Sequence, residues 1–130
     1  MTTTPFDDLG GEPAVRRLVE RFYREMEAHE PELTRLHLLD LGGRISAELR
    51  ERFALFLVGW LGGPQDYQER HGHPRLRLRH SSVQIGTAMR DAWLRSMKRA
   101  LDGEGVQGEL RALLDARFAE VADFLRNQLG

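Results

Sequence analysis

The sequence has no cysteine, and this absence excludes disulfide bonds, thiolate chemistry and cysteine-ligated zinc sites. It also has no apolar run that approaches the roughly 20 residues of a membrane-spanning helix. The N-terminal stretch MTTTPFDDLGG is polar and acidic, so it lacks the apolar segment of a secretory signal peptide. We therefore expect a cytoplasmic protein with no membrane partner.

The sequence also has no marked excess of positive or negative charge. The 19 basic and 20 acidic side chains give a formal net charge of −1. This balance provides no general attraction to nucleic acid, so we expect no nucleic-acid partner. With 41% hydrophobic and 30% charged residues in a chain of 130, the composition is typical of a soluble globular protein and predicts a single domain, residues 1–130.

Apolar residues recur at helical spacing in four segments, which predicts an all-α domain with four substantial helices. These segments are residues 14–28, about 44–60, about 87–102 and about 109–128. Pro13 suits the first turn of the first helix, the Gly-Gly-Pro at 62–64 ends the second, and Thr87 is expected to cap the third. Between the first two helices we expect a loop with one helical turn near residues 33–37.

A connector rich in histidine and arginine, residues 64–86, separates the second and third helices. Its middle, GHPRLRLRH, alternates apolar and basic residues, which alone is typical of a half-buried strand. No other segment predicts a strand to pair with it, and an unpaired strand leaves its backbone groups unsatisfied. We therefore interpret this stretch as a loop with short helical turns.

The histidines suggest two kinds of site. His71, His73 and His80 are candidates for a metal site, but the HxxxH spacing or cysteine pair usual in zinc sites is missing. A single histidine facing an apolar slot is sufficient for haem, because the porphyrin already supplies four ligands to the iron. From the residues alone, a haem slot and an ordinary core with a solvated arginine edge both remain open.

Enzyme motifs give little support for other chemistry. The sequence contains no GxSxG and no P-loop. GEGVQG at 103–108 matches GxGxxG in form, but it follows a predicted helix where a dinucleotide fingerprint needs a strand. We interpret it as an interhelical loop, and we assign most carboxylates to a charged surface.

Three longer strings are more specific. FLVGWLGGPQDYQERHGHPRLRLRH at 56–80 and IGTAMRDAWLRSM at 85–97 resemble the group II truncated haemoglobins, and FDDLGGEPAVRRLVERFYREM at 6–26 resembles the start of the same family. The resemblance implies a two-over-two globin fold in which helices 14–28 and 44–60 pack across 87–102 and 109–128. It also implies a first helix reduced to about residues 5–9, and a haem b between the helix pairs.

The same resemblance implies roles for individual residues. His80 matches the proximal ligand of the haem iron. Tyr23 and Trp93 match distal residues that donate hydrogen bonds to the bound ligand, and His37 matches a third distal position. The remaining candidates for haem contacts are Leu49, Phe53, Leu57, Tyr67, Leu76, Arg79, Val83, Ile85 and Met97, with Tyr67 and Arg79 meeting the propionates.

The function implied by the resemblance is binding of O₂, NO and CO. Two or three distal donors in a dry pocket predict slow O₂ release. Slow release favours peroxidase-like or nitric oxide dioxygenase chemistry with a reductase as electron donor, and is unsuited to bulk oxygen transport. A cofactor-free all-α interaction module is the alternative, a sensor acting by contact alone is a third hypothesis, and either a monomer or a homodimer is compatible with the sequence.

Overall fold

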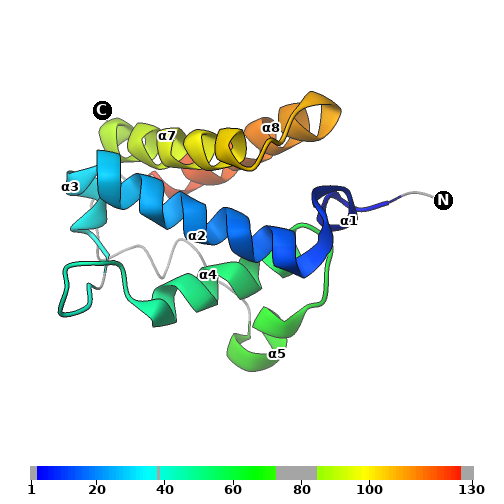
Figure 1. Ribbon diagram of the computed structural model, residues 1–130, viewed down its shortest axis with the longest axis horizontal. Helices are drawn as coiled ribbons and strands as arrows, with labels where there is room; N and C mark the ends of the chain where they lie inside the picture. The colour runs from blue at the N-terminus through cyan, green and yellow to red at the C-terminus, as the bar shows by residue number, and fades with distance from the viewer. Residues whose placement is uncertain (1–2, 38, 73–84, 127–130) are drawn as a thin grey trace.

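The computed structural model describes residues 3–37, 39–72 and 85–126 (Figure 1). Its helices are α1 (Pro5–Leu9), α2 (Gly11–His29), α3 (Pro31–Thr34), α4 (Ala47–Trp60), α5 (Asp66–His71), α7 (Thr87–Gly103) and α8 (Gly108–Leu125). Extended pairing in this part of the chain is limited to an isolated bridge between Leu39 and Ile45. The predicted all-α class and its four long helices are confirmed.

Two helix pairs form the body of the molecule. In Figure 1, α2 lies between α4 on one side and α7 on the other, and α8 lies beside α7; the same pairs make the main helix contacts. The buried face of α2 carries apolar residues at helical spacing, namely Val15, Leu18, Val19, Phe22 and Met26. The buried residues that α7 and α8 contribute to the same core include Met97, Leu101, Leu114 and Phe118. The expected packing of helix pairs is therefore present.

Two predicted helix starts are corrected by capping interactions. The second long helix begins at Ala47 and not at residue 44, because Ser46 is its N-cap and the Ser46 hydroxyl accepts a hydrogen bond from the Leu49 N–H at 3.3 Å. Thr87 does not cap α7: Gly86 holds the cap position and Thr87 is the first helical residue. The Thr87 hydroxyl instead accepts a hydrogen bond from Arg126 Nη1 at 3.2 Å, which ties the start of α7 to the end of α8.

The Gly-Gly pair after α4 is required by the close approach of α1. A Cβ on Gly63 would lie 2.7 Å from the Phe6 ring, and Gly62 has φ +104° with Thr4 at 2.8 Å from the same hypothetical atom. The Phe6 N–H donates to the Leu61 carbonyl at 3.0 Å. The short first helix is thus held directly on the turn that ends α4.

One carboxylate is buried, although most carboxylates were expected to lie on the charged surface. Glu30, directly after α2, is only 8% exposed. Its carboxylate accepts hydrogen bonds from Arg95 at 2.8 and 3.0 Å and from Arg99 at 2.9 Å, both on α7. These pairs lower the pKa of Glu30 from 4.5 to about 2 and fasten the end of α2 to α7.

We expect Glu30→Gln to lower the free energy of unfolding at pH 7 by about 1–2 kcal/mol, a modest value because both arginines are partly solvated. Since the folded-state pKa is depressed, this stabilisation is present above pH 4.5 and is lost as the pH falls toward 2. Urea denaturation at pH 7 and pH 3 measures it. Glu32→Gln, exposed on α3, is the control; an equal loss for Glu30→Gln at both pH values would contradict the assignment.

Candidate functional site

Phe22 of α2 is the centre of an aromatic cluster. Its ring centroid lies 4.9 Å from Tyr23, 5.5 Å from Phe53 of α4 and 5.2 Å from Trp93 of α7. Phe22 and Tyr23 are adjacent and therefore about 100° apart around α2, yet both are buried because α4 and α7 cover two sides of that helix. The fold therefore brings together three predicted site residues from three helices.

An apolar hollow opens between α4, α7 and α8. It is lined by Phe53, Phe56, Leu57, Trp60, Trp93, Phe118 and Val121. The rings of Trp60 and Phe118 stack with centroids 5.2 Å apart and form one wall. Large aromatic side chains that remain half-buried at an interior hollow leave apolar surface available to an apolar occupant.

Tyr23 provides a neutral hydrogen-bond donor at the edge of this cluster. Its side chain is buried, with the residue 6% exposed, and its hydroxyl forms no hydrogen bond with another residue of the described chain. Burial raises the pKa of Tyr23 above its ordinary value, nearby Glu20 raises it further, and Arg50 opposes the shift. The phenol therefore keeps its proton at neutral pH.

His37 lies beside Tyr23. The two rings meet edge to face with centroids 6.0 Å apart. His37 Nδ1 lies 2.9 Å from the Leu33 carbonyl oxygen. Because a carbonyl only accepts hydrogen bonds, Nδ1 carries a hydrogen, and Nε2 of the neutral ring is then an acceptor.

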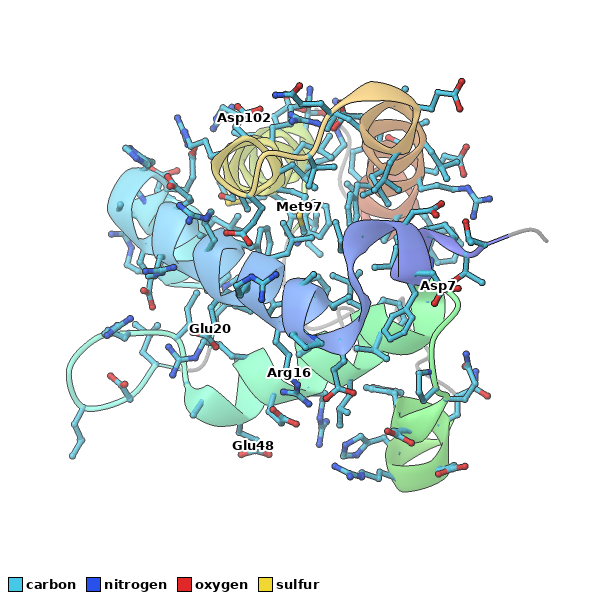
Figure 2. The ribbon with its side chains drawn as sticks, turned by 45° about the vertical axis from the view of Figure 1, so that its right-hand side comes forward. Asp7, Arg16, Glu20, Glu48, Met97 and Asp102 are labelled. Atoms are coloured by element: carbon cyan, nitrogen blue, oxygen red, sulfur yellow. The ribbon has the colours of Figure 1, made fainter. Side chains whose placement is uncertain are left out.

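The other predicted contact residues in the described ranges lie at different places in the fold. Phe53 and Leu57 line it, and Tyr67 of α5 places its ring edgewise against Phe56, at 5.8 Å between centroids. Leu49 is half-buried against the core and Met97 is fully buried; Figure 2 shows Met97 in the interior, while the labelled Asp7, Glu48 and Asp102 lie at outer faces. Ile85 is partly buried just before α7.

Four predicted haem contacts, His80, Leu76, Arg79 and Val83, lie outside the described residues. Their roles on the proximal side stay predictions, as does the loop conformation proposed for residues 73–80. By contrast, Trp60, Phe118 and Val121 line the hollow although the sequence pattern did not assign them to the site. Their helical spacing is the same as that of ordinary core residues, so the pattern carried no signal that separated them.

The described part of the chain contains neither a cluster of metal-binding side chains nor a membrane-spanning helix. Residues 3–37, 39–72 and 85–126 contain no group of three histidine, aspartate or glutamate side chains placed to hold a metal ion. None of the helices in these ranges has the length and apolar character needed to span a membrane.

The arrangement defines a class: an all-α sandwich of two helix pairs with an aromatic, apolar hollow between α4, α7 and α8 and hydrogen-bond donors beside it. The sequence model of the bacterial-like globins matches residues 4–127. The chain therefore belongs to the bacterial-like globin family.

Named relatives specify the branch of this family. The Group 2 truncated hemoglobin YjbI of Bacillus subtilis (strain 168) is 38% identical over 124 residues, which are 95% of this chain and 89% of the relative. The crystal structure of the group II truncated hemoglobin from Bacillus anthracis superposes with a TM-score of 0.90 at 35% identity, covering 100% of this chain and 95% of that one. A structure described as a truncated oxygen-avid haemoglobin from Bacillus subtilis matches with a TM-score of 0.85 at 37% identity, covering 96% and 100%.

The predicted two-over-two globin fold is thereby confirmed, and haem b is the cofactor of the family. The described residues fit this group. The hollow offers aromatic faces to a porphyrin, and the hydroxyl of Tyr23 and the indole N–H of Trp93 donate no hydrogen bond to another residue in the described ranges. Haem-based binding of diatomic gases such as O₂ is the activity of the family.

We expect burial of Tyr23 to make the protein sensitive to alkali. The phenol of the unfolded chain ionises near pH 10, whereas the raised pKa of Tyr23 keeps the folded form protonated. Tyr23 therefore contributes a loss of up to about 1.4 kcal/mol of unfolding free energy per pH unit above pH 10. Chemical denaturation of the haem-loaded protein and of Tyr23→Phe between pH 9 and 11 tests this; a difference between the two that stays constant with pH would contradict it.

Proposed function

We propose that this chain binds O₂ and other diatomic ligands at a haem b held by His80, with Tyr23 and Trp93 as hydrogen-bond donors to the ligand. The observation that carries the proposal is the convergence of these two residues on Phe53. The Phe53 centroid lies 5.9 Å from Tyr23 and 6.4 Å from Trp93. Two donors from different helices therefore flank one apolar side chain at the edge of the hollow.

The chemistry of the pocket follows from its residues. Haem, when bound, supplies the iron at which a diatomic molecule binds. Leu49 and Phe53 exclude water, and a hydrogen bond in such a dry site is stronger than in solvent. The Tyr23 hydroxyl donates a hydrogen bond and keeps its proton, because burial raises the pKa of the phenol and holds it neutral. Trp93 is a donor only, so it favours a ligand with partial negative charge.

His37 has a more restricted role than a third donor. Its Nδ1 hydrogen is directed to the Leu33 carbonyl, so the neutral ring offers only an acceptor at Nε2. His37 therefore donates toward the pocket from Nε2 only when it is protonated. In its neutral form, it orients the edge of the Tyr23 ring against which it packs.

Slow ligand release is the expected consequence of two donors in an apolar pocket. Such release suits redox chemistry on the ligand, either peroxide turnover or conversion of nitric oxide to nitrate, with a cytoplasmic reductase as electron donor. The solved relative described as oxygen-avid supports this direction. We propose that residues 1–130 act as one such domain.

His80→Ala tests the haem ligand. We expect the purified variant to lose the Soret band that the unchanged protein shows, because the substitution removes the imidazole that the proposal assigns to the iron. His29→Ala is the matched control, since His29 is exposed on α2 and pairs with Glu25. An unchanged spectrum for His80→Ala would overturn the assignment, and wild-type protein that stays colourless with added hemin would favour a cofactor-free interaction module.

Tyr23→Phe and Trp93→Phe test the donors. Each substitution removes a hydrogen bond while keeping an aromatic ring, and we expect O₂ to dissociate about tenfold faster in each case. Stopped-flow mixing of the oxygenated protein with a competing ligand measures the rate. Trp60→Phe is the control, because Trp60 lines the same hollow without a proposed donor role. Unchanged rates in both donor variants would refute the proposal.

A further inference from the structure

The outer surface of the contact between α2 and α7 is rich in arginine. Figure 1 shows these two helices side by side. At 100° per residue, the three arginines on α2 fall within an arc of about 60° on the solvent side of that helix. We call the arginines along this contact the basic seam, which consists of Arg17, Arg21, Arg24, Arg95 and Arg99.

Two buried carboxylates hold four of these arginines in place. Each carboxylate belongs to the residue that ends one helix, and each contacts two arginines of the other helix. Glu104, after α7, lies 3.4 Å from Arg17 Nε and 2.7 Å from Arg21 Nε, just as Glu30, after α2, binds the two arginines of α7. The two glutamate side chains are 16% and 10% exposed, whereas the four arginine side chains are 35% to 64% exposed. Solvent therefore meets guanidinium groups whose acidic partners lie beneath them.

Arg24, the fifth arginine of the seam, has no such partner. It is exposed, and it forms no ion pair or hydrogen bond with another described residue. The other acids nearby have partners of their own: Glu25 lies 3.3 Å from His29, and Asp102 lies 2.8 Å from Arg111. The five arginines outnumber the carboxylates of the seam, which are Glu25 and the two buried glutamates, by two. This positive excess occurs in a chain whose formal net charge is −1.

The positive surface is narrow, because the side of α2 that faces α4 carries acids. Glu20 lies 3.7 Å from Arg50 of α4, and Glu27 accepts a hydrogen bond from the Ile45 N–H at 2.7 Å. A long polyanion or a flat anionic membrane would extend beyond the seam onto these carboxylates. A compact acidic patch on a folded protein matches the seam alone, so charge complementarity favours a protein partner.

The seam is the outer surface of the two helices that carry much of the candidate haem site. Arg21 directly precedes Phe22, and Arg95 follows Trp93 by two residues. Phe22 and Trp93 pack together on the inner side, with ring centroids 5.2 Å apart, and Trp93 lines the hollow. One helix is about 10 Å thick. A protein bound at the seam would therefore be separated from the hollow by little more than these side chains.

We propose that the basic seam is the docking surface for an acidic protein that donates electrons to the haem. The inference rests on the proposed redox function, which needs a supply of electrons. In each encounter the donor loses one electron, which reduces the ferric haem iron to the ferrous state, and no atom is transferred. The seam extends from Arg17 to Glu30, or about 20 Å of helix. This length suits the small interfaces, below about 1,200 Å², of weak electron-transfer encounters.

Flavodoxin, a small acidic flavoprotein, is the probe in the test of this proposal. Titration calorimetry with oxidised flavodoxin measures docking, and stopped-flow mixing with reduced flavodoxin measures the reduction of the ferric haem. At low salt we expect Arg24→Glu to raise the dissociation constant and to lower the second-order rate constant, each at least about fivefold. Arg24→Lys keeps the charge, and both values are expected to stay within about twofold of the starting ones. Neither change removes a contact that holds the described fold, because Arg24 has no partner there.

A matched charge reversal on another helix is the control. Arg117→Glu alters the net charge by the same amount as Arg24→Glu, at an exposed position of α8, and is expected to leave both values unchanged. Equal effects of the two reversals would show that net charge alone acts, and would overturn the proposal. So would flavodoxin that does not bind, or that binds all variants alike.

Two further readouts separate this proposal from its alternatives. Vesicles of phosphatidylglycerol that bind only when Arg24 is present, while flavodoxin does not bind, would assign the seam to a membrane surface and overturn the proposal. Failure of the proposed function appears separately, as a chain that takes up no haem or as O₂ release that the distal donors do not slow. The calorimetric titration with oxidised flavodoxin involves no electron transfer, so it tests the docking surface in either case.

Discussion

The contact between α2 and α7 around Phe22 is the constraint on which the site depends. Phe22 packs against Trp93 across the two helix pairs, and its neighbours Tyr23 and Phe53 pack against it from α2 and α4. A change in the distance between α2 and α7 would move Trp93 relative to Tyr23. The geometry of the two proposed donors is therefore set by the same apolar packing that stabilises the fold.

Polar ties at the ends of the helices maintain this packing. Glu30 joins the end of α2 to Arg95 and Arg99 on α7, while Arg126 joins the end of α8 to Thr87. These bonds join charged and hydroxyl side chains of helices that lie side by side. The hollow beside Trp93, by contrast, is lined by apolar and aromatic residues in the described part of the chain.

Much of the fold could be predicted because it depends on local patterns. Helical spacing located the four long helices, and the Gly-Gly pair at the end of α4 marked a real turn. The start of α4 and the cap of α7 were misplaced. Ser46 is an N-cap residue type that the apolar spacing did not register, and Gly86 holds the cap position of α7 without a side-chain hydrogen bond. The burial of Glu30 could not be predicted, because its partners lie more than 60 residues away in the chain.

The sequence by itself determined the class of protein, the positions of its helices and the family strings that single out Tyr23, Trp93 and His80. Tertiary structure decided which apolar residues line the hollow, and that the His37 Nδ1 hydrogen is directed to Leu33. The physical reason is that periodicity records which side of a helix is apolar. It does not record what packs on that side, because this depends on helices distant in the chain.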